Sequence, residues 1–173
     1  MYTRYSGKVV TLGRFDYIVN LIPPEFTLVA NILNDETEEA LIKLINSNDR
    51  IKLTETMKCI ASEFQPELNY KLNDFSWNKL KPGEGMMPEK EDSKYYNPCV
   101  IVINMGSDIE LILLEQATRK QVPIILPRKS MFLLNDVKWK FQRAIPKKFE
   151  DKLSNGEVIK REERYSLVFK SRK

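Results

Sequence analysis

Three acids that lie close together, Glu89, Glu91 and Asp92, have the clearest capacity for chemistry, and they follow the glycine-rich turn Gly83–Gly85. Paired carboxylates can act as a general acid and base, or can bind a hard cation such as Mg²⁺. Acids in a charged loop are also typical of a solvated surface. The spacing favours that second interpretation, and catalysis by these acids stays an alternative.

Other common catalytic systems are excluded by composition. The chain has 173 residues and no histidine, so Ser-His and Cys-His nucleophile pairs cannot form. Gly83–Gly85 lacks the Lys and the Ser or Thr that follow in a phosphate-binding P-loop. Cys59 and Cys99 are isolated and have no metal-ligand spacing, so we expect two reduced thiols.

The elements that must position any site are mostly short strands. After Leu72 the sequence alternates between β-rich runs and turn signals. The predicted strands are 74–80, 99–105, 109–115, 121–126, 131–134, 138–143 and 164–170. Regularly spaced short strands of this kind predict an antiparallel sandwich or barrel.

Two helices are predicted before these strands. A strand over Phe26–Leu33 is followed by Asp35 and Glu38, which have the spacing of a capping box with Asp35 as the cap. The second helix carries apolar residues at helical spacing and ends before Pro66. The predicted fold class is α+β, with two helices packed on an antiparallel double-stranded β-helix, or jelly roll. We expect an arm over residues 1–26 and one domain over residues 27–173.

Three stretches carry a family resemblance. The first runs from Asn78 through Gly83 and Pro88 to Ser93, the second from Leu126 to Pro146, and the third is Arg164–Lys170. In order and spacing they resemble the motifs of the AlkB-like iron and 2-oxoglutarate oxygenases, whose third motif reads Arg-x-Ser-x-x-x-Arg. The resemblance covers about residues 27–170 and is closest to the mitochondrial branch of that family.

The resemblance implies a metal site that this chain has lost. The family binds iron through two His and one carboxylate, and the matching positions here are Glu89, Glu91 and Arg143. A guanidinium has no lone pair for a metal and stays protonated. We therefore expect a pseudoenzyme with no iron. Our hypothesis is that Arg143 occupies the vacated metal position and pairs with Glu89 or Glu91, since buried charges need partners.

The co-substrate positions implied by the resemblance are partly retained. Asn78, Arg164 and Ser166 match the family, whereas Leu80 replaces a Tyr and both Lys138 and Lys170 replace Arg. Replacing Arg by Lys removes a bidentate partner for a carboxylate. We expect little binding of 2-oxoglutarate, and a sensor of 2-oxoglutarate or another dicarboxylate stays an alternative.

The charge distribution bears on partners. The net charge is +4 with a pI near 8.9, and residues 137–173 hold twelve Lys or Arg and five Asp or Glu, a net charge of +7. Such a surface can meet RNA, anionic lipid or an acidic protein. The first fifteen residues are basic and rich in hydroxyls, which is typical of a mitochondrial targeting segment. No apolar run approaches the ~20 residues of a transmembrane helix.

The predicted function is that of a structural subunit. We expect a catalytically inactive domain in a large mitochondrial complex, with the mitochondrial ribosome slightly favoured over a respiratory-chain complex, and the cytoplasm as the alternative location. A free RNA-binding module is a further alternative, because Trp139, Phe141 and Tyr165 lie among basic residues and exposed aromatics can stack bases. In the family pattern, however, these aromatics are core positions.

Overall fold

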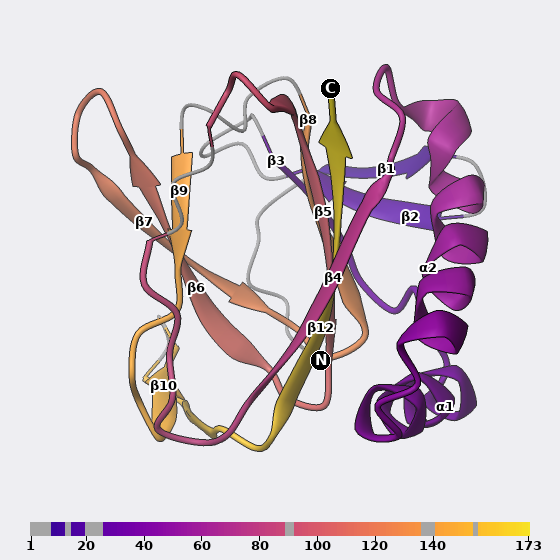
Figure 1. Cartoon of the computed structure of the whole chain (residues 1–173). Helices are drawn as coiled ribbons and strands as arrows, with labels where there is room; N and C mark the ends of the chain where they lie inside the picture. The colour runs from indigo at the N-terminus through magenta and orange to yellow at the C-terminus, as the bar shows by residue number, and fades with distance from the viewer. Residues whose placement is uncertain (1–7, 13–14, 20–25, 89–91, 136–140, 154–155) are drawn as a thin grey trace.

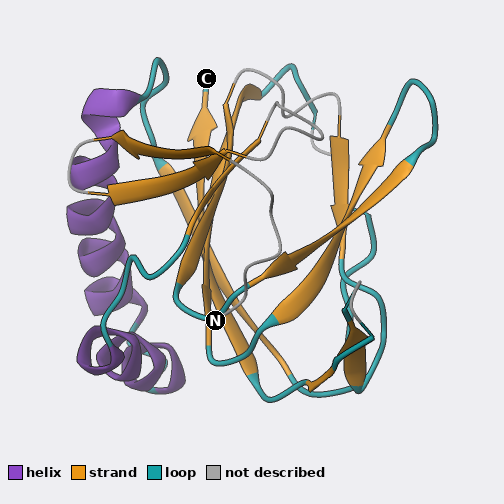
Figure 2. Ribbon diagram, turned by 180° about the vertical axis from the view of Figure 1, so that it is seen from behind, coloured by secondary structure: helices purple, strands orange, loops and turns teal. Residues whose placement is uncertain are grey.

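Two antiparallel sheets face each other, and two helices cover the outer side of the larger sheet (Figure 1). The computed structural model describes residues 8–12, 15–19, 26–88, 92–135, 141–153 and 156–173. Figure 2 shows the same layers from behind, with the helices on one flank and the smaller sheet on the other. The predicted α+β jelly-roll class is confirmed.

The larger sheet has seven strands in the order β1-β2-β3-β8-β5-β12-β4, and the smaller sheet has three in the order β7-β6-β9. Strands β10 and β11 form a separate hairpin. The elements are β1 Lys8–Leu12, β2 Phe15–Val19, β3 Phe26–Val29, α1 Asp35–Asn46, α2 Arg50–Phe64, the 3₁₀ turn η1 Gln65–Glu67, β4 Asp74–Leu80, β5 Tyr96–Met105, β6 Ile109–Glu115, β7 Gln121–Leu126, β8 Ser130–Asn135, β9 Phe141–Ala144, β10 Glu150–Lys152, β11 Val158–Lys160 and β12 Arg164–Arg172.

The predicted bounds of β4, β6 and β7 are confirmed, and β5, β8 and β12 are each longer than predicted. The strand expected over Phe26–Leu33 ends at Val29, since Asn31 has a φ of 55°, which breaks the extended chain. Of the strand expected over 138–143, residues 138–140 lie outside the described part of the chain. The sequence did not predict the hairpin β10–β11, because its three-residue strands are too short to show a period.

Helix α1 begins one residue earlier than the capping pattern indicated. The N-cap is Asn34, whose side-chain Oδ1 accepts a hydrogen bond from the Thr37 backbone N–H at 2.7 Å. Asp35, predicted as the cap, is the first helical residue and pairs instead with Lys129 at 2.7 Å. The prediction was wrong because Asn and Asp are nearly equivalent as caps and stand side by side here.

The alternation of side chains along the central strands produces two apolar cores. On one face of β5, the residues Cys99, Ile101, Ile103 and Met105 pack against the helices. On the other face, side chains from both sheets meet in a second cluster. Strand β12 alternates in the same way, so its residues at positions 164, 166, 168 and 170 face the space between the sheets.

The segment that the sequence assigned to an N-terminal arm carries two strands. Strands β1 and β2 form an antiparallel hairpin, and β2 pairs with β3, so this hairpin extends the larger sheet. Figure 2, seen from behind, shows one end of this hairpin in front of α2. The boundary predicted between an arm and a domain therefore falls inside a continuous sheet. That residues 1–26 act as a separate arm stays a prediction.

An ion pair in which one partner is buried links helix α1 to the loops of the sheets. The Glu38 side chain is fully buried, and its two oxygens accept hydrogen bonds from the Arg128 guanidinium at 2.6 and 2.9 Å. One of them also accepts the Gly106 backbone N–H at 3.1 Å. These bonds tie α1 to the loops that follow β5 and β7. None of the helices in the described part of the chain is long and apolar enough to cross a membrane.

Candidate functional site

The site lies between the two sheets, against the first residues of β12. Arg164 and Ser166 point into this space because they occupy alternate positions on the strand, and both are buried. Strand β4 pairs antiparallel with β12, with Ser166 opposite Asn78 and Arg164 opposite Leu80. Pairing in this register places the side chains of Asn78 and Leu80 on the same face as Arg164.

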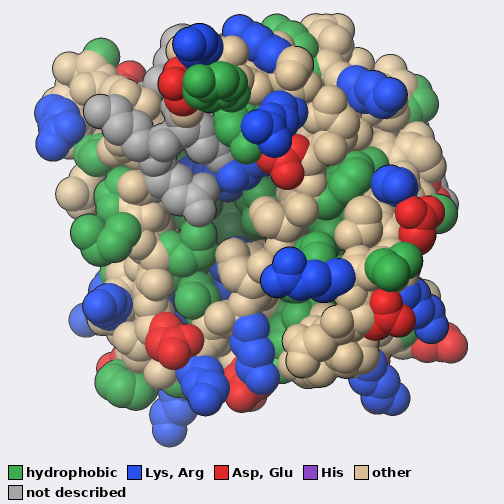
Figure 3. Space-filling view, viewed as in Figure 1, with side chains coloured by type: hydrophobic (Ala, Val, Ile, Leu, Met, Phe, Trp, Pro, Cys, Tyr) green, Lys and Arg blue, Asp and Glu red, His purple; other side chains and the backbone are tan. Residues whose placement is uncertain are grey.

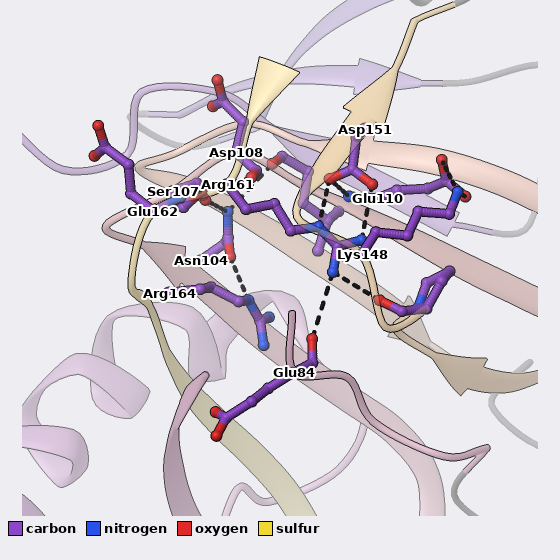
Figure 4. A network of polar contacts seen from close by, with 12 residues as sticks. Glu84, Asn104, Ser107, Asp108, Glu110, Lys148, Asp151, Arg161, Glu162 and Arg164 are labelled. Atoms are coloured by element: carbon purple, nitrogen blue, oxygen red, sulfur yellow. Dashed lines mark hydrogen bonds and ion pairs between the residues drawn. The ribbon is translucent and has the colours of Figure 1, made fainter. Parts of the chain in front are cut away.

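A hydrogen-bond network joins the polar residues of this site, and Figure 4 shows the part of it in which Arg164 contacts Asn104. Arg164 Nε donates to Asn104 Oδ1 at 2.7 Å, and its Nη1 donates to Asn78 Oδ1 at 3.5 Å. The Ser166 hydroxyl donates to the same Asn78 oxygen at 2.7 Å. Among the described residues, the Nη2 group of Arg164 has no hydrogen-bond acceptor. The guanidinium is thus fixed on one side only.

The side chain of Asn104 holds the Arg164 guanidinium in position. Its amide nitrogen donates to the backbone carbonyl oxygens of Ser107, Leu126 and Pro127, at 2.9, 3.2 and 3.0 Å. All the donors of this amide face backbone, so its Oδ1 must point toward Arg164. The position was not recognised from the sequence, although a single Asn inside the apolar run Cys99–Met105 was the available signal.

Arg164 is a buried cation without a carboxylate partner in the described part of the chain. Burial, together with the nearby positive charges of Arg143 and Arg161, lowers its pKa to about 9. Because that pKa lies above neutral pH, the guanidinium is still protonated. A protonated guanidinium without a carboxylate partner is a centre of positive potential. Burying such an uncompensated charge costs free energy.

Arg161 stands beside this centre and is fully compensated. Its Nε and Nη2 each donate to Asp151 at 2.7 Å, and both side chains are almost completely buried. Its Nη1 donates to the Pro146 carbonyl oxygen at 2.6 Å. Asp151 also accepts the Glu110 backbone N–H at 3.2 Å. This bidentate pair therefore adds no net charge. No local pattern in the sequence indicated that these two residues would pair.

A small cavity lies next to Arg164. Its volume is about 30 Å³, which is room for about two water molecules. Most of the lining residues are apolar. The polar side chains of the lining are those of Asn78, Arg143, Arg164 and Ser166. The lining residues are Asn78, Met86, Val102, Leu111, Leu126, Arg143, Ala144, Ile145, Arg164, Ser166 and Val168.

Arg143 reaches this cavity from the opposite sheet. It lies on β9 opposite Leu113, whose side chain belongs to the core between the sheets, so Arg143 points inward and lines the cavity. The structure thus brings Arg143, predicted as a former metal-ligand position, together with Asn78, Arg164 and Ser166. Glu89, Glu91 and Lys138 lie outside the described residues, so the hypothesis that Arg143 pairs with one of these two acids is not tested.

The other two predicted co-substrate positions do not line the cavity. Leu80 is half-buried and packs against the apolar core between the sheets. Lys170 lies on the same face of β12 as Arg164, but six residues along an extended strand, which corresponds to about 20 Å. Its Nζ stands 5.9 Å from the centre of the Tyr96 ring.

The donors present do not fit an iron ion. No histidine exists anywhere in the chain, and the described residues contain no group of three or more Cys, Asp or Glu placed to hold a metal. Arg143, the one predicted metal-ligand position within the described part, carries a cation. An iron site needs neutral imidazole and carboxylate donors with open positions, so no reaction step through iron follows from this geometry.

Residues 137–173 carry a net charge of +7, and contact of this basic region with RNA stays a prediction. On the face shown in Figure 3, blue Lys and Arg side chains alternate with red Asp and Glu side chains. Phe141 and Tyr165, considered as base-stacking residues, are only 6% and 5% exposed, and Trp139 lies outside the described residues. Stacking on nucleic acid needs an exposed ring, so neither of the two described aromatics can provide it as the chain is folded.

Comparisons with known proteins support the fold and leave the family open. No protein-family model matches the chain. An uncharacterized protein from Acanthamoeba polyphaga mimivirus is 30% identical over 99 residues, which are 54% of this chain and 45% of that protein. The chain therefore spans less than half the length of this viral relative.

The structure of a prolyl-4-hydroxylase from Pseudomonas putida is similar with a TM-score of 0.52 and 11% sequence identity, over 86% of this chain and 88% of that chain. At this identity the similarity establishes the shared jelly-roll fold.

Proposed function

We propose that this chain is a non-catalytic, AlkB-like jelly-roll domain that serves as a structural component of a larger assembly. The observation that carries the proposal is the position of Arg143, which lines the cavity between the sheets where the AlkB motif places a histidine ligand. A permanently charged guanidinium repels a metal cation, and the chain has no other imidazole. The motif resemblance and the shared fold support the choice of family.

The test is iron binding and turnover of 2-oxoglutarate by the purified chain. After reconstitution with Fe(II) and ascorbate, we expect far less than one equivalent of bound iron and no succinate above the background without enzyme. The triple variant Glu89→His, Glu91→Asp, Arg143→His is the matched control, because it restores the ligand set and should retain more iron than the wild type. Stoichiometric iron in the wild type, or succinate formation by it, would refute the proposal.

The assembly and its compartment rest on charge and on the motif resemblance. The basic, hydroxyl-rich N-terminal residues and the likeness to the mitochondrial branch support a mitochondrial complex, with a ribosome slightly ahead of a respiratory-chain complex. Affinity purification of the tagged chain from its native cells should recover one defined set of mitochondrial subunits. Recovery of the chain alone, or with proteins of another compartment, would contradict this part.

A dicarboxylate sensor is the second candidate function, and the buried Arg164 with Ser166 beside it favours it. The cavity of about 30 Å³ weighs against it, because 2-oxoglutarate is several times larger than the space available. Titration calorimetry with 2-oxoglutarate decides between the two: we expect no heat of binding at millimolar concentration, and saturable binding would favour the sensor.

A further inference from the structure

We propose that the cavity between Arg143 and Arg164 binds a small monovalent anion, such as chloride or nitrate, which neutralises the buried Arg164 guanidinium. The inference rests on the proposed loss of the metal site and names the ligand that replaces it. The ligand differs from the dicarboxylate that the family resemblance implies, and its identity follows from the charge and size of this cavity.

The charge of the site calls for an anion. Arg164 is 2% exposed, and the described residues offer it two Asn oxygens as acceptors and no carboxylate. Arg143 also lines the cavity, and Arg161 is neutralised by Asp151, so Arg164 is the cation on which the need for an anion rests. A guanidinium that is buried and still protonated is stabilised strongly by a negative partner in direct contact.

The geometry of the site provides the donors. Two of the five N–H groups of Arg164 are used by Asn104 and Asn78. The Nη2 group has no acceptor in the described part of the chain, and the residue lines the cavity, so an anion there can accept hydrogen bonds directly. An almost fully buried polar group of this kind, beside a cavity, is satisfied when a water molecule or an ion binds there.

The size of the site selects the ligand class. A volume of about 30 Å³ accommodates about two water molecules, which is enough for a halide or a small planar oxyanion. The remaining walls are apolar, among them Val102, Leu111 and Val168. Such walls favour a weakly hydrated monovalent ion over a strongly hydrated divalent one, because desolvation of the divalent ion costs more.

The first experiment is thermal unfolding of the metal-free full chain at constant ionic strength, with sodium chloride replacing sodium gluconate, whose anion is too large for the cavity. We expect Tm to rise with chloride, by roughly 5–10 °C at about a hundredfold excess over the dissociation constant. Arg164→Met should abolish this rise. Arg172→Gln, which removes an exposed cation on the same strand, should leave it unchanged.

A second variant keeps the test valid if Arg164→Met fails to fold. Asn78→Asp preserves the shape of the side chain that accepts from Ser166 and Arg164, and it supplies a fixed negative charge at the same oxygen. It should fold and lose the dependence on chloride. Crystals of the wild type grown in sodium bromide should show anomalous density within hydrogen-bonding distance of the Arg164 guanidinium.

Several outcomes would overturn the inference. A wild-type Tm that is independent of chloride, together with crystals that lack bromide density, would mean that water fills the cavity. A chloride effect that appears only in the double variant Glu89→Gln, Glu91→Gln would mean that the chain supplies its own counter-ion. Stabilisation by 2-oxoglutarate and not by chloride would assign a dicarboxylate. Bound iron refutes the proposed function separately, since metal analysis does not depend on the anion titration.

Discussion

Asn104 holds the polar centre of this protein together, and it shows how one buried amide can orient a charged neighbour. Its nitrogen satisfies three backbone carbonyl oxygens, and its oxygen receives Arg164 Nε. A side chain with both donors and an acceptor is required here. Asn78 has a different role, because its amide nitrogen makes only a weak contact, with the Met86 sulfur at 3.8 Å, among the described residues.

The first prediction concerns the substitution Asn104→Asp. It removes the amide donor shared by three backbone carbonyl oxygens, of which that of Pro127 keeps the Ser130 hydroxyl as a donor. It also places a carboxylate beside these oxygens, so we expect a loss of about 3 kcal/mol in the free energy of unfolding, despite the new ion pair with Arg164. Asn78→Asp, which adds the same charge to the same guanidinium without losing such donors, is the control. Urea unfolding measures both, and equal losses in the two variants would contradict this account.

At the residue scale the sequence identified part of the site. Asn78, Arg143, Arg164 and Ser166 were predicted from motif positions, and the structure places all four on one cavity. Asn104 and the pair of Arg161 and Asp151 were missed because contacts between residues far apart in the chain leave no local pattern. Lys170 was grouped with Arg164 on motif spacing alone, although the rise of an extended strand separates them.

At the scale of elements, the ion pair of Glu38 and Arg128 links helix α1 to the loop after β7. The two partners differ in their surroundings. The Glu38 side chain is 1% exposed, whereas that of Arg128 is 47% exposed. Removing either partner breaks the same contact. Without Glu38, the remaining Arg128 guanidinium is in contact with water, whereas without Arg128 the remaining Glu38 carboxylate is enclosed by protein.

The second prediction follows from this difference. Arg128→Met leaves a buried carboxylate with only the Gly106 N–H, and we expect it to cost about 3–5 kcal/mol. Glu38→Gln leaves a guanidinium that water can reach, and we expect about 1–2 kcal/mol. Urea unfolding of each variant is the measurement, and Lys129→Met, which removes a cation paired with an exposed acid, is the control with little effect. A larger cost for Glu38→Gln would be evidence against the model of an asymmetric pair.

Elements were more predictable than their boundaries. Strands β4, β6 and β7 follow from the alternation of apolar residues between clear turn signals, and both helices follow from their apolar spacing. The cap at Asn34 and the hairpin β10–β11 depend on geometry over two or three residues, where several sequences fit equally well. The pairing order of the strands could not be read from the sequence, since it depends on contacts between distant segments.

At the scale of the whole molecule, stability is concentrated in the middle of the larger sheet. Strands β5 and β12 are hydrogen-bonded on both edges, and each is covered by helices on one face and by the smaller sheet on the other. Strand β7 has only one neighbour in its sheet, and the first three residues of the strand are exposed or half-exposed.

The third prediction is a gradient of amide hydrogen exchange. We expect the slowest exchange in Ile101–Met105 and Leu167–Phe169, at rates close to global unfolding, because opening there disrupts both cores. Exchange in Gln121–Ile124 should be faster by about tenfold or more. Mass spectrometry of deuterated fragments provides the measurement, and uniform exchange across both sheets would show that the molecule opens as a single unit.

The place of β12 between β5 and β4 has a consequence for the biosynthesis of the protein. Its neighbours β4 and β5 are both made earlier, so the growing polypeptide carries two unpaired β edges until Arg164–Arg172 emerges from the ribosome. Open edges of this kind are prone to pair with other chains. During translation, the larger sheet is therefore incomplete until β12 has been synthesised. The exposed edges of β4 and β5 are where we expect a chaperone to bind.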